Sequence, residues 1–174
     1  GQALRPMRKP LVIMMSKRLL RFKGAMSELC EFTDGAYKPV VTDPQLHQSQ
    51  KVKRVILCSG QVYYDVLEAR KQRECEDEVA IVRLEQLYPF PVAELNDVLA
   101  SWPNCYEWIW LQEEPENQGA WRQIRHELAA LKINTPYWQY AGRPAAAAPA
   151  TGYGRVHKQQ IDEFLAAAFA DIQP

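Results

Sequence analysis

The chain has 174 residues, 47% of them hydrophobic and 24% charged, a balance typical of a domain that buries a core and keeps a hydrated surface. Lysine and arginine number 21 and aspartate and glutamate also number 21, so the formal net charge is zero, which argues against nucleic acid or an anionic membrane as partner. The longest aliphatic run, residues 11–15, is far shorter than the ~20 apolar residues that cross a bilayer, which excludes a membrane span.

The first 50 residues form the smaller of two unequal parts and end in a connector. Residues 11–15 form a short continuous apolar run, which is typical of a strand buried on both faces. Residues 17–31 carry a broken helical pattern around Gly24 and predict one helix or two short ones. Residues 39–50 are rich in proline, glutamine and aspartate and read as a surface connector. The sequence therefore predicts a domain boundary near Gln50.

From residue 51 onwards, strand and helix patterns alternate. Apolar runs predict strands at 55–58, 79–84, 106–111 and 137–140, while apolar stripes at helical spacing predict helices at 62–73, 91–102, 121–131 and 157–172. Parallel neighbours need a helical crossover, so this alternation predicts an α/β fold, a three-layer sandwich with a mostly parallel sheet. Residues 142–154 are expected to form an ordered loop. Ligands of such sheets bind beyond the carboxyl ends of the strands.

Sequence patterns of catalysis are missing. The chain has no GxSxG, Walker, GxGxxG or HExxH pattern, so we predict no catalytic and no metal-ligating residue in it. Three histidines fall in a connector and two helices and read as surface or helix residues: His47, His126 and His157. The cysteines lack CxxC spacing and predict reduced thiols in a cytosol-like compartment: Cys30, Cys58, Cys75 and Cys105.

Two polar groups stand out against this background. The acidic turn after the strand at 106–111 favours helix capping or a contact with another domain, and the interface hypothesis comprises Glu113, Glu114, Asn117 and Trp121. The second group is basic, and its members could converge on one phosphate if the connector folds back, or could be solvated surface charge. The anion hypothesis comprises Lys17, Arg21, Lys51, Arg54 and Arg83.

Four motifs in register resemble a known family. They are RVILCSGQVYYDVL at 54–67, VAIVRLEQLYPFP at 79–91, QEEPENQGAW at 112–121 and YAGRP at 140–144. In this order they resemble the carboxyl-terminal region of the thiamine-diphosphate-dependent, decarboxylating subunit of 2-oxoglutarate dehydrogenase. RKPLVIM at 8–14 is similar to the end of the preceding pyrimidine-binding domain of that family. The resemblance implies that residues 1–50 are the end of that domain plus a connector, and that 51–174 form a transketolase-like carboxyl-terminal domain.

The resemblance also implies a function for the parent subunit. Such a subunit is a homodimer that decarboxylates 2-oxoglutarate in the tricarboxylic acid cycle and passes the succinyl group to lipoamide on a succinyltransferase core. Thiamine diphosphate and magnesium would be bound outside this chain, which would be structural or regulatory and inactive alone. The implied compartment is the bacterial cytoplasm or the mitochondrial matrix, and no targeting segment is visible in the sequence.

The resemblance leaves alternatives open. A 2-oxoadipate dehydrogenase has a similar carboxyl-terminal region, and a free-standing regulatory domain for a nucleotide or coenzyme A is a second alternative. Some family members hold AMP or acetyl-CoA near the junction with the catalytic domains, which is why the basic residues form an allosteric-site hypothesis. Ala146 and Ala148 stand where the family usually has serines, and this removes two hydroxyls from any phosphate site.

Overall fold

The computed structural model describes residues 6–7, 9–43, 50–133 and 137–172, and the chain forms two compact units. The first unit covers residues 1–36 and the second covers residues 37–174. The predicted boundary near Gln50 concerns the domains of a longer subunit and stays a prediction. His47 and most of the predicted connector lie outside the described residues.

The first unit contains only short helices. Two 3₁₀ helices, η2 (Lys17–Arg21) and η3 (Lys23–Ala25), precede the five-residue helix α1 (Leu29–Thr33). None of the three has a buried residue, so no packed face supports a long helix. The prediction of one helix over residues 17–31 is therefore wrong, and the alternative of short helices is closer to the structure, although η2 and η3 are 3₁₀ helices. The predicted strand at 11–15 is also wrong. These side chains are 58–91% exposed, because no described strand pairs with them.

The second unit is built on a five-stranded sheet in its described residues. Its strands are β1 (Val40–Val41), β2 (Arg54–Cys58), β3 (Val79–Leu84), β4 (Glu107–Pro115) and β5 (Gln139–Arg143), in the order β1-β3-β2-β4-β5. β1 is antiparallel to β3, and every other pairing is parallel. The mostly parallel sheet is therefore confirmed, and the short edge strand β1 lies within the segment predicted to be a connector.

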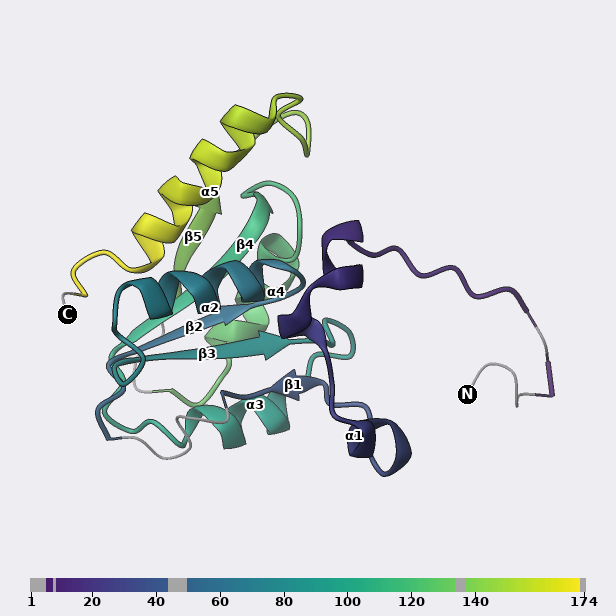
Figure 1. The fold of residues 1–174 in the computed structure, drawn as a ribbon. Helices are drawn as coiled ribbons and strands as arrows, with labels where there is room; N and C mark the ends of the chain where they lie inside the picture. The colour runs from purple at the N-terminus through teal and green to yellow at the C-terminus, as the bar shows by residue number, and fades with distance from the viewer. Residues whose placement is uncertain (1–5, 8, 44–49, 134–136, 173–174) are drawn as a thin grey trace. The chain divides into compact units, whose positions relative to one another are not determined.

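Helices cover both faces of this sheet, as can be followed in Figure 1. They are α2 (Val62–Gln72), α3 (Val92–Leu99), α4 (Trp121–Ala129) and α5 (Gly154–Ala168). Successive residues of a strand point to opposite faces, and β2 follows this rule: Val55 and Leu57 pack with α3 and α4, whereas Ile56 and Cys58 pack with α2 and α5. Two separate apolar cores result, which gives three layers.

Two buried arginines connect the helices to the sheet through ion pairs and hydrogen bonds. Arg70 of α2 pairs with Asp43, which follows β1, and also donates to the carbonyl of Val79 at 2.9 Å. Arg54, at the start of β2, donates to Glu107 at 2.8 Å and to the carbonyl of Ala168 at the end of α5, also at 2.8 Å. Arg54 therefore joins two strands and the last helix.

Candidate functional site at the carboxyl edge of the sheet

The order of the strands marks one position on the sheet. From β2 the chain continues through α2 to β3 on one side, and it then crosses through α3 to β4 on the other side of β2. Ligands of open parallel sheets bind at such a reversal, beyond the carboxyl ends of the strands. Here these ends are Ser59–Gly60 after β2 and residues 112–120, which include the end of β4.

Gln112 organises the turn at the end of β4. It is 2% exposed, and its Oε1 accepts hydrogen bonds from Trp110 Nε1 and from the backbone N–H of Trp121, both at 3.0 Å. Its Nε2 lies 2.8 Å from the carbonyl oxygen of Gln118, 3.1 Å from that of Pro115 and 3.2 Å from that of Glu114. One buried amide thus satisfies the indole of a core tryptophan and the backbone of the whole turn.

The same turn needs a glycine. Gly119 has a φ of +63°, and a Cβ placed there would lie 3.0 Å from Gln112 Nε2 and 3.0 Å from Glu114 Cβ. The glycine therefore permits both the left-handed backbone and the close approach of the Gln112 amide. It also places Trp121 at the start of α4, where its ring packs on Tyr140 with centroids 5.5 Å apart.

A second loop is joined to this turn through main-chain contacts. Asn117 Nδ2 donates to the carbonyl of Ala146 at 3.0 Å, and Asn117 Oδ1 accepts from the N–H of Ala146 at 2.9 Å. Arg143 donates to Gln160 Oε1 and to the carbonyl of Pro149, both at 2.6 Å. These bonds hold the loop from Pro144 to Tyr153. The loop predicted at 142–154 is shorter in the structure, because Gly142 and Arg143 belong to β5 and Gly154 begins α5.

Glu113 lies at the reversal point and faces α2. The side-chain nitrogen of Gln61 donates to both of its carboxylate oxygens, at 2.8 and 3.0 Å. Burial raises the pKa of the Glu113 carboxyl, the Gln61 hydrogen bonds lower it, and the negative charges of Glu114 and Asp65 raise it further. Glu114 is exposed. Glu113, Glu114, Asn117 and Trp121 therefore lie along one segment from the end of β4 to the first residue of α4, and their role at an interface stays a prediction.

The basic residues are more widely distributed. Arg83, at the end of β3, lies over the ring of Tyr63 at 4.7 Å from its centroid, donates to Tyr64 Oη at 3.2 Å and pairs with Glu85 at 2.7 Å. Arg54 pairs in register with Val79 at the start of β3, whereas Arg83 pairs with Cys58 at the end of β2. The structure therefore does not bring Arg54 and Arg83 together.

The remaining members of the anion hypothesis are Lys51, Lys17 and Arg21. Lys51 is exposed and pairs with Asp77 at 3.1 Å. Lys17 and Arg21 belong to the first unit, at the two ends of η2. Of the three predicted residues in the second unit, only Arg83 lies at the carboxyl edge, and Glu85 partly neutralises its charge.

The chemistry available at this edge is recognition by hydrogen bonds. Burial raises the pKa of the Cys58 thiol to about 12, so this thiol is protonated at neutral pH and is not a nucleophile there. Among the described residues, no three His, Cys, Asp or Glu side chains are grouped as a metal site requires. Sequence reasoning missed Gln112, and the one signal for it was a polar residue directly after the apolar run of β4.

Taken together, the fold and this edge define a class of α/β domain with a mostly parallel sheet and a rigid, amide-braced turn at the strand reversal. Within this class the chain belongs to the family described as 2-oxoglutarate dehydrogenase C-terminal, whose model matches residues 26–169. Among the described residues, no helix has the length and apolar character required to cross a membrane.

Curated relatives agree with the family match. The chain is 46% identical over 172 residues to the 2-oxoglutarate dehydrogenase E1 component of Cupriavidus necator, with 99% of this chain and 18% of that protein covered. It is 46% identical over 171 residues to the protein of the same name from Azotobacter vinelandii, covering 97% and 18%. For that of Brucella ovis the identity is 41% over 178 residues, covering 94% and 18%. The chain thus spans about 18% of the length of these relatives.

Proposed function

We propose that this chain is the carboxyl-terminal, transketolase-like domain of a thiamine-diphosphate-dependent 2-oxoglutarate dehydrogenase subunit. The observation that carries this proposal is the family match over residues 26–169, together with relatives of which the chain spans only 18%. The whole subunit would decarboxylate 2-oxoglutarate and pass the succinyl group to lipoamide. The remaining domains of the subunit, a second copy and a lipoyl succinyltransferase core are the proposed partners, in the bacterial cytoplasm or the mitochondrial matrix.

Within that subunit we assign this domain a supporting role. Gln112 directs its amide to backbone carbonyls and to an indole N–H, and Asn117 directs its amide to backbone atoms of Ala146. Such bonds hold loops in place. A rigid edge of this kind supports a neighbouring domain by presenting a fixed surface, on which Glu113 and Glu114 provide carboxylates.

The cofactor has no residues to hold it in the described part of this chain. Bound thiamine diphosphate supplies an electron sink for decarboxylation, and its diphosphate requires a metal. The described residues do not fit that requirement, because no three His, Cys, Asp or Glu side chains among them are grouped as a metal site requires. We therefore assign no residue of this chain to magnesium or to the diphosphate.

Reconstitution of the subunit tests this function. The full-length subunit, the subunit lacking residues 37–174 and the present chain are each assayed for 2-oxoglutarate-dependent reduction of ferricyanide. We expect turnover by the full-length subunit, none by the present chain, and recovery when the truncated subunit and the chain are combined. Decarboxylation by the chain alone would overturn the proposal, and so would a truncated subunit as active as the full-length one. Parallel assays with 2-oxoadipate decide between the two substrates.

The effector hypothesis is proposed in a narrower form. An anion such as AMP or acetyl-CoA would contact Arg83, since this arginine lies at the carboxyl edge whereas Arg54 and Lys51 of the same unit do not. Calorimetric titration of the full-length subunit with each ligand tests this, comparing Arg83→Ala with Arg122→Ala, which removes an exposed arginine of α4 as a control. We expect weaker binding for Arg83→Ala only. Equal affinity of the two variants would exclude Arg83 from the site.

A further inference from the structure

The turn between β2 and α2 is fastened to the end of β4 by the side chain of Gln61. Its Nε2 donates to both carboxylate oxygens of Glu113, at 2.8 and 3.0 Å. Both side chains are half-buried, and 52 positions separate them in the sequence. The paired residues of β2 and β4 end at Cys58 and Leu111, so this contact joins the two segments beyond the last backbone pair.

Gly60 gives this turn a hinge. Its φ is +77°, and no described atom lies within 4 Å of the position that a Cβ would take. Rotation of the backbone at this glycine therefore meets no packed neighbour and no penalty for the left-handed conformation. The amides of Tyr63 and Tyr64 donate to the carbonyls of Gly60 and Gln61, at 3.4 and 3.1 Å. These two bonds tie the first turn of α2 to the hinge.

Ionisable groups from three elements act on Glu113. Glu114 follows it in β4, Asp65 belongs to the first turn of α2, and His157 belongs to the first turn of α5. Burial raises the pKa of Glu113 above its ordinary value of 4.5, and the charges of Glu114 and Asp65 add to this effect, whereas the Gln61 hydrogen bonds and His157 lower the pKa. The site therefore binds a proton more tightly than a carboxylate in water does.

We propose that Gln61 and Glu113 form a proton-sensitive latch at the start of α2. The latch closes when Glu113 takes up a proton from water, and it opens when the carboxylate is left charged. In the closed form Gln61 donates to the neutral carboxyl, which Glu114 and Asp65 no longer repel. In the open form the turn rotates about Gly60 and water solvates the carboxylate. This inference does not depend on the proposed function.

The direction of the switch follows from proton linkage. A carboxyl group with a higher pKa in the closed form than in the open form holds more protons when closed, so a falling pH favours closure. This stabilisation is complete below the ordinary pKa of 4.5 and is lost as the pH rises through the raised pKa. The latch should therefore weaken as the pH rises from 4.5 towards neutrality.

Opening of the latch would also act on Arg83. The rings of Tyr63 and Tyr64 have their centroids 4.7 and 5.9 Å from the guanidinium carbon of Arg83, and Arg83 donates to Tyr64 Oη at 3.2 Å. Both tyrosines lie in the first turn of α2, which the open form no longer ties to β4. The latch thus sets how firmly the arginine at the carboxyl edge is held.

Amide hydrogen exchange of Tyr63 and Tyr64, followed by NMR on the 174-residue chain, measures the opening. After correction for intrinsic exchange, we expect the protection of these amides to fall at least about threefold between about pH 4.5 and 7.5. It should stay constant in Glu113→Gln, whose neutral amide still offers an oxygen to Gln61. Protection that is independent of pH in the wild type, or that falls equally in Glu113→Gln, would overturn the proposal. A Glu113 pKa at or below its ordinary value, measured by carbon-13 NMR, would do so as well.

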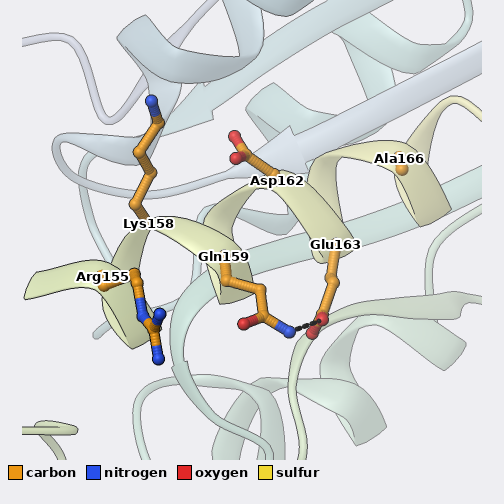
Figure 2. A pocket seen from close by; sticks show the side chains of 6 residues that line it. All are labelled: Arg155, Lys158, Gln159, Asp162, Glu163 and Ala166. Atoms are coloured by element: carbon orange, nitrogen blue, oxygen red, sulfur yellow. Dashed lines mark hydrogen bonds between the residues drawn. The ribbon is translucent and has the colours of Figure 1, made fainter. Parts of the chain in front are cut away.

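Charge variants test the groups that act on the latch. Asp65→Asn should shift the exchange transition to lower pH, because a repelling charge is lost, and His157→Gln should shift it to higher pH. Lys158→Gln is the matched control for His157→Gln, because Lys158 is the next residue of α5 but lines a shallow depression that His157 does not line. Figure 2 shows this depression on α5, with its lining residues Arg155, Lys158, Gln159, Asp162, Glu163 and Ala166. A shift in the control as large as in His157→Gln, or no shift in Asp65→Asn, would overturn the proposed arrangement.

Discussion

Replacing Gln112 with methionine removes the amide that braces the turn after β4 while keeping the length of the side chain. The Trp110 indole N–H then has no acceptor in a site where both residues are at most 2% exposed. An orphaned buried donor costs about 2 kcal/mol, and loss of the half-buried bonds to the turn adds about 1–2 kcal/mol. We therefore expect the free energy of unfolding to fall by about 3–4 kcal/mol.

The assay is urea unfolding followed by tryptophan fluorescence, with circular dichroism as a second probe of two-state behaviour. Gln61→Met is the matched control, because Gln61 is half-buried and its side chain donates to the partly buried Glu113 carboxylate. We expect the control to lose less than about 1 kcal/mol. For a domain of this size, the Gln112 variant should also melt about 10 °C lower. Equal losses in the two variants would refute the bracing role of Gln112.

Three further predictions concern the same unit. Gly119→Ala should lower the free energy of unfolding by about 3 kcal/mol and Gly152→Ala by about 1 kcal/mol. Both glycines have a positive φ, but only at Gly119 would a Cβ lie against neighbouring atoms. Equal losses of the two variants in urea titrations would contradict this reasoning. Asp43→Asn leaves the buried Arg70 guanidinium without its carboxylate partner. The free energy of unfolding in urea should fall by about 3 kcal/mol. An unchanged urea midpoint would count against a structural role of this ion pair. The Cys58 thiol has its pKa raised from 9.0 to about 12 by burial, so the unfolded state releases this proton first. Stability should therefore fall above about pH 9 by about 1.4 kcal/mol per pH unit, and Cys58→Ala should remove that part of the slope in unfolding titrations from pH 7 to 10.

The centre of the sheet in the second unit was largely predictable because β2 and β3 are buried on both faces. Continuous apolar runs at 55–58 and 79–84 become β2 and β3, bounded as predicted within one residue. β5 was predicted at 137–140 but covers Gln139–Arg143, since its partner β4 extends to Pro115 and pairs that residue with Arg143. The polar end of β4 read as a loop, although its backbone is still paired there.

The first unit and the candidate site were less predictable. The run at 11–15 has the composition of a buried strand, yet burial depends on neighbouring strands that a local pattern does not contain. Val40–Val41 forms a strand only because β3 offers an edge, which two valines in a polar segment do not indicate. The separation of Arg54 from Arg83 follows from parallel register, and the role of Gln112 follows from contacts that span nine residues.

The side-chain amide of Asn117 contacts only main-chain atoms of Ala146, and every residue except proline has both of them. An N–H and a carbonyl at position 146 satisfy it, so the position of the loop is independent of which non-proline side chain stands there. A serine could replace this alanine, adding a hydroxyl at the rim of the sheet without moving the main chain. The scaffold can thus exchange one recognition surface for another at this loop while its architecture is retained.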